Sequence, residues 1–305
     1  MISKDKITEI FCTIDDFSQV FEKSLEKSLI SSGKKMRRRK FKMSKGEILT
    51  ITVLFHLSGM KTFKHYYLFY VQKHLKNEFP ETVSYNRFVE LMQSNMLALT
   101  LFLKTARLGE VTGISFVDST PIRVCNNKRI KRNKVFKDIA TTGKSTMGWF
   151  YGFKLHIIVN DKGEILDFMI TRANTDDRTP LKTDHFLKKI FGKLYADKGY
   201  ISKDLTDILF QQGLHLVTGM KSNMKNVLMT MKDKILLRKR SVIETINDQL
   251  KNIAQIEHSR HRSFSNFITN LIAGIIAYSF QEKKPSIKFE TEKSNQLSTK
   301  VSFLG

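Results

Sequence analysis

The chain has 305 residues, enough for one large domain or two smaller ones that each bury a hydrophobic core. Hydrophobic residues make up 41% of it, which indicates a globular protein and excludes a disordered one, and its longest apolar stretch is too short to cross a bilayer. The 52 Lys and Arg against 29 Asp and Glu give a net charge of +23, which favours a nucleic acid over a membrane surface as the partner.

The N-terminal part of the chain is predicted to be helical. Apolar residues recur at helical spacing over 4–23, and further helices are predicted over 44–58, 62–71 and 84–103. The last three helices, with sharp turns between them, are typical of a helix-turn-helix module, although a plain three-helix packing domain gives the same pattern. The residues ahead of the first helix form no apolar signal region, so we expect a cytoplasmic protein.

A basic run over 33–42 separates the first predicted helix from the second. It contains Arg37, Arg38 and Arg39 and shows no apolar period. The run is therefore either a solvated loop or an arm that contacts the phosphates of a nucleic acid. The three arginines are candidate DNA contacts.

Two short predicted strands each end in an aspartate. Ile114 to Val117 supply the apolar residues of the first, Asp118 follows, and the segment 119–121 is expected to end the strand. The second strand, 194–196, runs into Asp197 in the same way. Taken alone, each aspartate reads as a turn cap. A carboxylate at the end of a buried strand is costly unless a cation meets it, and the repetition of the pattern favours a site.

The segment between these strands is predicted to contain a basic cluster, a polar loop and a β-hairpin. The loop is expected over 141–148, and the hairpin pairs 149–159 with 164–170 around a glycine turn. The basic cluster follows directly on the first aspartate, so its residues are expected to contact the DNA backbone rather than only solvent: Lys128, Arg129, Lys131 and Arg132.

Polar residues within and after the hairpin are expected to be structural. His156 reads as a structural histidine, and Asp176 and Asp177 as a turn and a helix cap before a helix over 181–191. A helix over 203–212 and a strand over 214–218 follow. The order of these elements predicts a mixed sheet flanked by helices.

A later helix carries Glu244 on a face separate from its apolar stripe. Arg240 lies four residues before Glu244 and Lys251 seven after it, so the three side chains share one side of the helix. This pattern suits an exposed face with ion pairs. It equally suits an acid that binds a metal between two cations that bind phosphate. A closing helix is predicted over 264–280, and the chain is polar from 281 onward.

Three blocks of the sequence, 116–121, 195–200 and 240–251, resemble those of bacterial insertion-sequence transposases of the DDE type. The last block has the family's arginine, three residues, the glutamate, six residues and a lysine. Many members place a tyrosine where this chain has Leu237, so no tyrosine role is carried over. The resemblance covers roughly 112–281. It implies the ribonuclease H-like fold that these enzymes share with retroviral integrases.

The domain organisation expected from this resemblance has three parts. Residues 1–105 would form a helical, helix-turn-helix-like DNA-binding domain, and 106–281 a catalytic domain with a five-stranded mixed sheet. Residues 282–305 would be a polar, flexible tail.

The resemblance also implies the site and the activity. Asp118, Asp197 and Glu244 would bind two Mg2+ or Mn2+ ions, while Arg240, Lys251 and Lys198 contact DNA. The protein would bind double-stranded element ends and target DNA as a homodimer or larger oligomer, near the bacterial nucleoid. It would cleave strands and transfer the freed 3′-hydroxyl. Two alternatives stay open: a metal-dependent nuclease without joining activity, and a catalytically inactive DNA-binding regulator.

Overall fold

The structure is a computed structural model that describes residues 2–32, 41–220, 228–257 and 261–287. The predicted DNA contacts Arg37, Arg38 and Arg39, and most of the predicted tail, lie outside the described residues.

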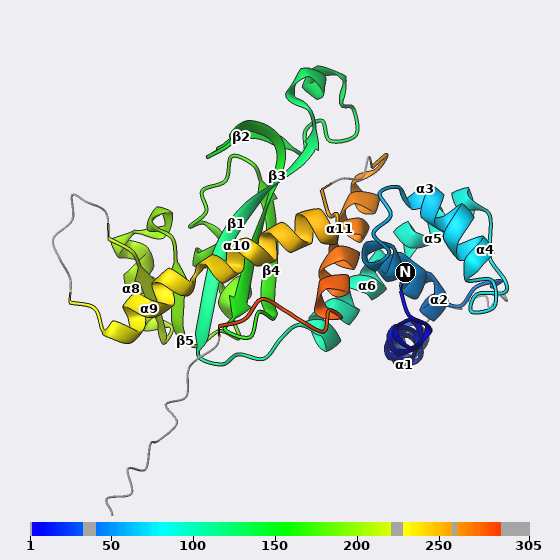
Figure 1. The fold of residues 1–305 in the computed structure, drawn as a ribbon, viewed down its shortest axis with the longest axis horizontal. Helices are drawn as coiled ribbons and strands as arrows, with labels where there is room; N and C mark the ends of the chain where they lie inside the picture. The colour runs from blue at the N-terminus through cyan, green and yellow to red at the C-terminus, as the bar shows by residue number, and fades with distance from the viewer. Residues whose placement is uncertain (1, 33–40, 221–227, 258–260, 288–305) are drawn as a thin grey trace, which may run out of the picture.

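Helices form the N-terminal part of the chain, on one side of the molecule (Figure 1). The second helix begins at the predicted capping box, because Ser44 Oγ accepts from Glu47 N and Glu47 Oε2 accepts from Ser44 N. The predicted helix over 84–103 is broken at Asn95, whose side chain donates to Leu91 O. The elements are α1 (Lys4–Ser31), α2 (Lys45–Leu57), α3 (Phe63–His65), η1 (Tyr66–Val71), α4 (Gln72–His74), α5 (Tyr85–Ser94), α6 (Met96–Phe102) and η2 (Leu103–Arg107).

A curled mixed sheet follows, and within the described residues it has six strands. The order is β2-β3-β1-β5-β6, with β4 also paired to β3. β1, β2 and β4 each run antiparallel to β3, whereas β5 is parallel to β1 and β6 to β5. This arrangement confirms the mixed sheet flanked by helices. The strands are β1 (Ile114–Cys125), β2 (Thr141–Ser145), β3 (Gly148–Asn160), β4 (Ile165–Arg172), β5 (Gly192–Ala196) and β6 (Leu214–Thr218).

The expected end of the first strand was wrong. β1 continues through Pro121 to Cys125 and stays paired with β3 along this length. Its parallel pairing with β5 covers only Ile114 to Phe116, so beyond Phe116 this side of β1 is an open edge. A proline is tolerated on an edge strand because no neighbour there needs its missing N–H group.

The prediction of a loop over 141–148 was also wrong. This segment contains a sixth strand, one more than the five expected. Thr141–Ser145 forms β2, which pairs with the beginning of β3. Thr142 and Lys144 on this strand are exposed. An edge strand with one side in water needs no apolar alternation, so its polar sequence resembles a loop.

The predicted helix over 181–191 is replaced by two short pieces, η4 (Pro180–Lys182) and α7 (Asp184–Leu187). Thr183 has extended backbone angles, φ −98° and ψ 126°, which separate them. Leu181, Phe186, Leu187 and Ile190 are buried as a helical pattern would predict, whereas Phe191 is exposed, and the backbone does not continue as one helix.

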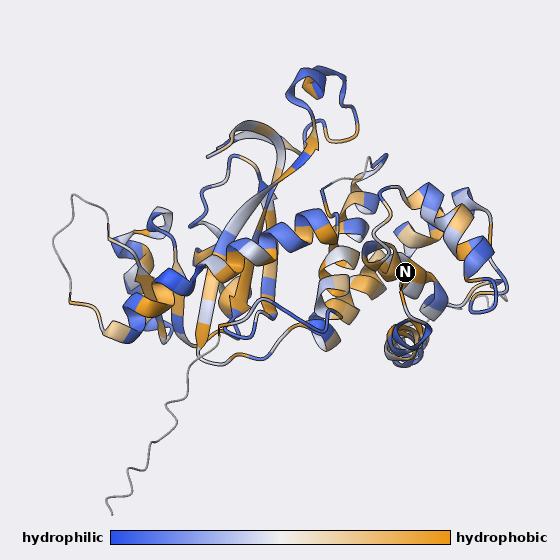
Figure 2. Cartoon of the chain, in the orientation of Figure 1, coloured by the Kyte–Doolittle hydropathy of each residue, from blue (hydrophilic) through white to orange (hydrophobic). Residues whose placement is uncertain are grey.

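Two cores lie on the two faces of the sheet. The smaller core packs under α7 and α8 (Lys203–Gln211). The larger one joins the other face to α10 (Ser241–Asp248), α11 (Phe264–Ser279) and the N-terminal helices. α11 contacts α2, α5 and α6, and it is among the most hydrophobic segments in Figure 2. The remaining elements are η3 (Asn127–Arg132), η5 (Lys198–Tyr200), α9 (Met231–Lys239) and η6 (Gln249–Ile253). In the described part of the chain, we find no helix with the length and apolar character needed to span a membrane.

We expect Gly192→Ala to destabilise the protein by about 2 to 5 kcal/mol, because two costs add. Gly192 has φ +86°, and a Cβ there would meet Gly113 O at 2.4 Å, where the first residues of β5 and β1 adjoin. Gly213→Ala is the matched control, since Gly213 has φ +78° but nothing within 4 Å of a Cβ. The control is expected to lose only about 1 to 2 kcal/mol. Urea unfolding of both variants measures the difference, and equal losses would mean that the close approach to Gly113 is unimportant.

Candidate active site

Asp118 lies on β1 and faces the helix α10. Side chains on a strand alternate between the two faces, and Phe116 packs in the larger core while Val117 packs in the smaller one. Asp118 therefore points to the same face as Phe116. Asn247 of α10 confirms this direction, because its Nδ2 donates to Asp118 Oδ2 at 3.1 Å.

Asp197 follows directly after the neighbouring strand, β5. β5 is parallel to β1, and Phe116 is paired with Tyr195. Asp118 and Asp197 each lie two residues beyond this pair, where the parallel pairing of β1 and β5 has ended. Asp197 is exposed and its backbone carbonyl accepts from Tyr200 N, which starts the short helix η5.

Glu244 lies on α10, the helix that packs across β1 (Figure 1). The helix buries Val242, Ile243 and Ile246 against the sheet. Glu244 itself is exposed, and Arg240 Nη2 donates to its Oε1 at 2.7 Å. The predicted pairing of these two residues on one helical face is confirmed, and in this structure the carboxylate of Glu244 is held by that arginine.

The electrostatics of the site centre on Asp118. Burial raises the pKa of Asp118 from 3.8 to about 6. The charges of Glu244 and Asp177 raise this pKa further, while Arg240 opposes the rise. A carboxylate that is desolvated beside other carboxylates favours the approach of a cation.

The carboxylates of the three predicted acids are suitable ligands for a divalent metal ion, although they do not lie together in this structure. Within the described ranges, no group of three His, Cys, Asp or Glu side chains is close enough to hold a metal ion. The three predicted acids nevertheless offer the hard oxygen ligands that such ions prefer. The buried Oδ1 of Asn247, beside Asp118, has no hydrogen-bond partner among the described residues, which leaves one more oxygen donor there.

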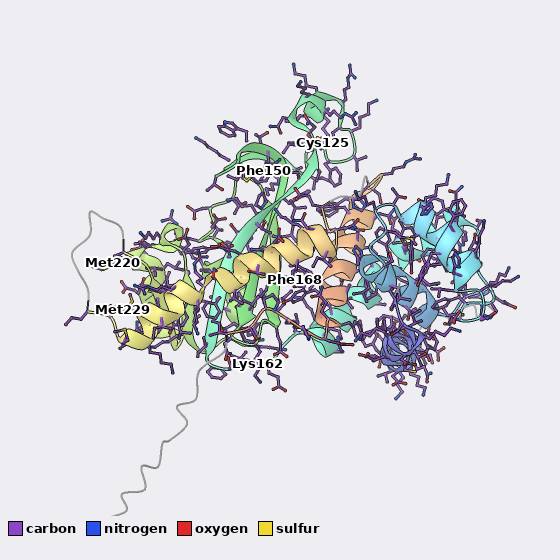
Figure 3. The ribbon with its side chains drawn as sticks, viewed as in Figure 1. Cys125, Phe150, Lys162, Phe168, Met220 and Met229 are labelled. Atoms are coloured by element: carbon purple, nitrogen blue, oxygen red, sulfur yellow. The ribbon has the colours of Figure 1, made fainter. Side chains whose placement is uncertain are left out.

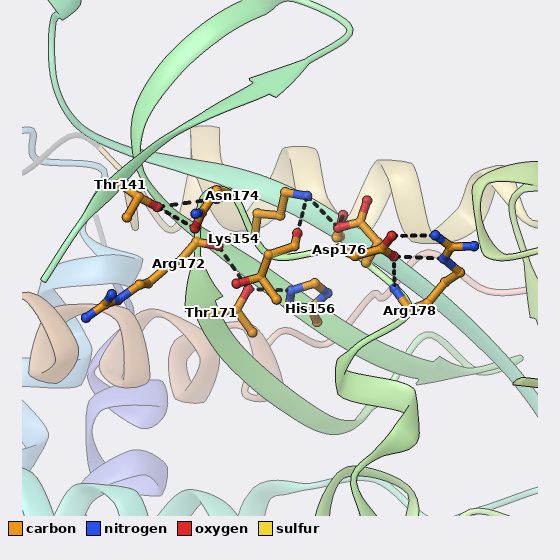
Figure 4. A network of polar contacts seen from close by, with 11 residues as sticks. Thr141, Lys154, His156, Thr171, Arg172, Asn174, Asp176 and Arg178 are labelled. Atoms are coloured by element: carbon orange, nitrogen blue, oxygen red, sulfur yellow. Dashed lines mark hydrogen bonds and ion pairs between the residues drawn. The ribbon is translucent and has the colours of Figure 1, made fainter. Parts of the chain in front are cut away.

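Asp177 contributes to the site, which the sequence analysis did not anticipate. Its neighbour Asp176 makes the expected turn and binds Arg178 (Figure 4). Asp177 instead turns toward the sheet, where its Oδ1 accepts from Ser119 Oγ at 2.8 Å and from Lys154 Nζ at 2.9 Å. The pair of adjacent acids after β4 could have indicated this, because the turn is capped by Asp176 alone and Asp177 is left for another contact.

His156 lies on β3, inside the sheet. It is fully buried, and its Nε2 lies 2.8 Å from Thr171 Oγ1 (Figure 4). Burial lowers the pKa of His156 to about 4, with Asp177 opposing this change and Lys154 adding to it. The ring is therefore neutral near pH 7 and does not supply a positive charge to the site.

The predicted cations fall into two groups. Lys251 lies near Asp118, on the π-helical turn η6, with its Nζ 3.6 Å from Glu257 Oε2. Burial is the main cause that lowers the pKa of Lys251. The other described candidates are exposed: Lys198 in η5, and Lys128, Arg129, Lys131 and Arg132 in η3, on a loop that projects from the sheet (Figure 1).

We expect Arg240→Ala to weaken DNA binding about tenfold while shifting the melting temperature by no more than about 2 °C. An ion pair with an exposed carboxylate adds only a few tenths of a kcal/mol to stability, whereas a lost phosphate contact acts directly on binding. Arg238→Ala is the matched control, because Arg238 is an exposed arginine two residues earlier. Gel-shift titrations and thermal melts give both numbers. A collapse of the melting transition would assign Arg240 to the fold instead.

A family model described as a transposase DDE domain matches residues 108–264. Among solved structures, the chain is similar to that of a piggyBac transposase synaptic complex with hairpin DNA, with 10% identity and a TM-score of 0.41. That match covers 89% of this chain and 72% of the other. The search of curated proteins gave no match.

Proposed function

The chain belongs to the transposase DDE domain family, whose model covers more than half of its residues, and we propose that it is the transposase of a bacterial insertion sequence. In this proposal it binds the terminal inverted repeats of the element, cleaves strands there and joins the freed 3′-hydroxyl to target DNA. One observation supports the proposal: Asp118 faces the helix that bears Glu244, and Asp118 and Asp197 each lie two residues beyond the last parallel pair of β1 and β5.

Asp118, Asp197 and Glu244 would hold the divalent metal ions on which this family depends, Mg2+ or Mn2+ and two in number. When bound, two such ions activate the attacking oxygen and stabilise the leaving oxygen of a phosphoryl transfer. The buried carboxylate of Asp118 suits this role because a cation would relieve its repulsion by the neighbouring acids.

Other residues of the chain would orient the carboxylates and the DNA. Asn247 fixes the Asp118 carboxylate through its Nδ2. Arg240 and Lys251 would bind the phosphates on either side of the reacting one, because both place a positive charge near Asp118. The exposed cations of η3 would extend this contact along the backbone. With a net charge of +23, the binding should weaken steeply as salt is raised.

The assembly would contain at least two copies, because two element ends are cut and joined together. We propose that a homodimer or larger oligomer forms with the DNA, in the bacterial cytoplasm at the nucleoid.

Two other functions use the same residues differently. A metal-dependent nuclease would cleave with these carboxylates but would not join ends. An inactive regulator would bind DNA only, and the Arg240–Glu244 ion pair is the observation that favours it, since Glu244 is already occupied.

A cleavage and joining assay separates the three. Supercoiled DNA carrying the flanking element ends is incubated with Mg2+ and either the protein or its Asp118→Ala variant. Joined products that the variant loses would support the transposase. Cleavage without joining would favour the nuclease, and binding without cleavage the regulator.

A further inference from the structure

The β2–β3 hairpin exposes two large apolar side chains at its tip. Trp149, the one tryptophan of the chain, is 61% exposed, and Met147 in the turn is 82% exposed. Phe150, the next residue of β3, is buried, and Figure 3 marks its place at this end of the sheet. Ser145 Oγ bonds to Gly148 O and to Met147 N, so the turn is well defined. The solvent-exposed indole ring of Trp149, next to a hydrogen-bonded turn, can therefore stack against a planar ligand.

One cation lies beside this ring, and a basic loop is bonded to its backbone. Lys144 is paired with Trp149 across the hairpin, and its Nζ lies 5.9 Å from the ring centroid. Asn127 Nδ2 donates to Trp149 O at 2.8 Å, which ties the hairpin to the basic loop η3. The tip therefore combines an aromatic face with a lysine beside it and the basic loop η3 attached to it. Such a combination is typical of surfaces that bind nucleic acid strands.

A hollow of about 350 Å³ lies between the hairpin and the loop of Asp177. Lys144, the residue beside Trp149, lines it from the hairpin, while Asp177 and Gly199 line it from two other loops. Asp177 in turn accepts a hydrogen bond from Ser119, the residue after Asp118.

We propose that Trp149 stacks on an unpaired DNA base at a strand end, while the cations of η3 bind the adjoining phosphates. Base–aromatic stacking is favourable for every nucleobase, so this contact requires no particular sequence. A base within a duplex would first have to leave its stack, at a cost in free energy that an unpaired base does not carry. The tip should therefore distinguish a frayed or overhanging end from a closed duplex.

This inference rests on the proposed function, because strand cleavage would supply the unpaired end. The residues involved, Trp149, Met147 and Lys144, are separate from the three carboxylates. Its test uses binding in the absence of metal, so that it does not depend on cleavage or joining.

The fluorescence of the single tryptophan reports the contact directly. The full-length protein is titrated with a duplex that carries a single-stranded 3′ overhang, and with a blunt duplex of equal phosphate count. Stacking predicts strong quenching by the overhang DNA at saturation and little quenching by the blunt duplex. Equal quenching by both, or binding of the overhang DNA without quenching, overturns the proposal but leaves the proposed function standing. Failure to bind either DNA would contradict both.

Three variants complete the test. Trp149→Leu should weaken binding of the overhang DNA about 5- to 100-fold and leave binding of the blunt duplex unchanged. Trp149→Phe keeps an aromatic face and should recover most of this loss. Arg129→Ala is the matched control, since loss of a phosphate contact should weaken both DNAs alike. Equal loss for both DNAs in Trp149→Leu would contradict stacking on an unpaired base.

Discussion

Replacing Asp118 with asparagine is expected to reduce strand cleavage and joining at least about a thousandfold, equivalent to about 4 kcal/mol of transition-state stabilisation. The change is nearly isosteric, and the new amide oxygen still accepts from Asn247 Nδ2. What it removes is the negative charge of the carboxylate that the proposed metal ions require. The rates of nicking and joining of supercoiled DNA measure the effect.

The same variant is expected to be more stable than the wild type at pH 7, which separates loss of activity from loss of fold. Burial raises the pKa of Asp118 to about 6, so the folded protein disfavours the ionised form. This penalty is absent below pH 3.8, where the carboxyl is protonated in both states, grows as the pH rises toward 6, and is complete above it. Its size at pH 7, before any metal binds, is about 2 to 3 kcal/mol.

Urea unfolding of the metal-free variant and wild type at pH 7 and pH 4 tests this expectation. The stability gain of Asp118→Asn should be largest at pH 7 and nearly vanish at pH 4. Asp207→Asn is the control, because Asp207 is exposed on α8. It should change neither stability nor cleavage. A variant that is less stable than the wild type at pH 7 would make Asp118 a structural residue.

The short apolar segments that precede the two aspartates were predictable as strands. Asp197 follows β5 directly, whereas Asp118 lies within β1, and two residues before each of them Phe116 pairs in parallel with Tyr195. The helix with Glu244 was predictable from its apolar stripe, which packs on β1. In these segments the apolar residues are the buried ones, so local sequence patterns were sufficient to predict the elements.

The errors arose where tertiary pairing overrides local composition. Pro121 marks a strand end in most contexts, but here it lies on an open edge and β1 continues past it. β2 is polar because its outward side chains face water. Neither fact is visible without knowing which strands are neighbours.

Two residues near Asp118 were missed for different reasons. Asn247 lies four residues after Ile243 and three before Leu250, so it falls on the buried stripe, and a polar residue at such a position was a usable signal. The sequence signal for Asp177 was ambiguous, because either Asp176 or Asp177 could cap the turn. The contacts with Ser119 and Lys154 decide between them, and those residues are distant in the sequence.

Glu244→Gln is expected to abolish cleavage to a similar extent as Asp118→Asn while leaving the binding of element ends unchanged. The glutamine keeps a hydrogen bond to Arg240 and the helix keeps its packing, because Glu244 is exposed and only its charge changes. Cleavage assays and gel shifts on the same DNA measure the two effects. Asp248→Asn is the control, since Asp248 is an exposed acid on the same helix whose contact is with Asn252.

The result also identifies the third carboxylate. Asp177 is the other acid whose charge acts on Asp118, and Lys154 holds it as Arg240 holds Glu244. Cleavage at the wild-type rate in Glu244→Gln would remove Glu244 from the site, and a loss in Asp177→Asn would then assign its role to Asp177. If Glu244→Gln is inactive and Asp177→Asn retains cleavage, Asp177 serves only to fix the loop against Ser119. Arg240 occupies only Oε1 of Glu244, so Oε2 would remain free to bind a metal ion without loss of this ion pair.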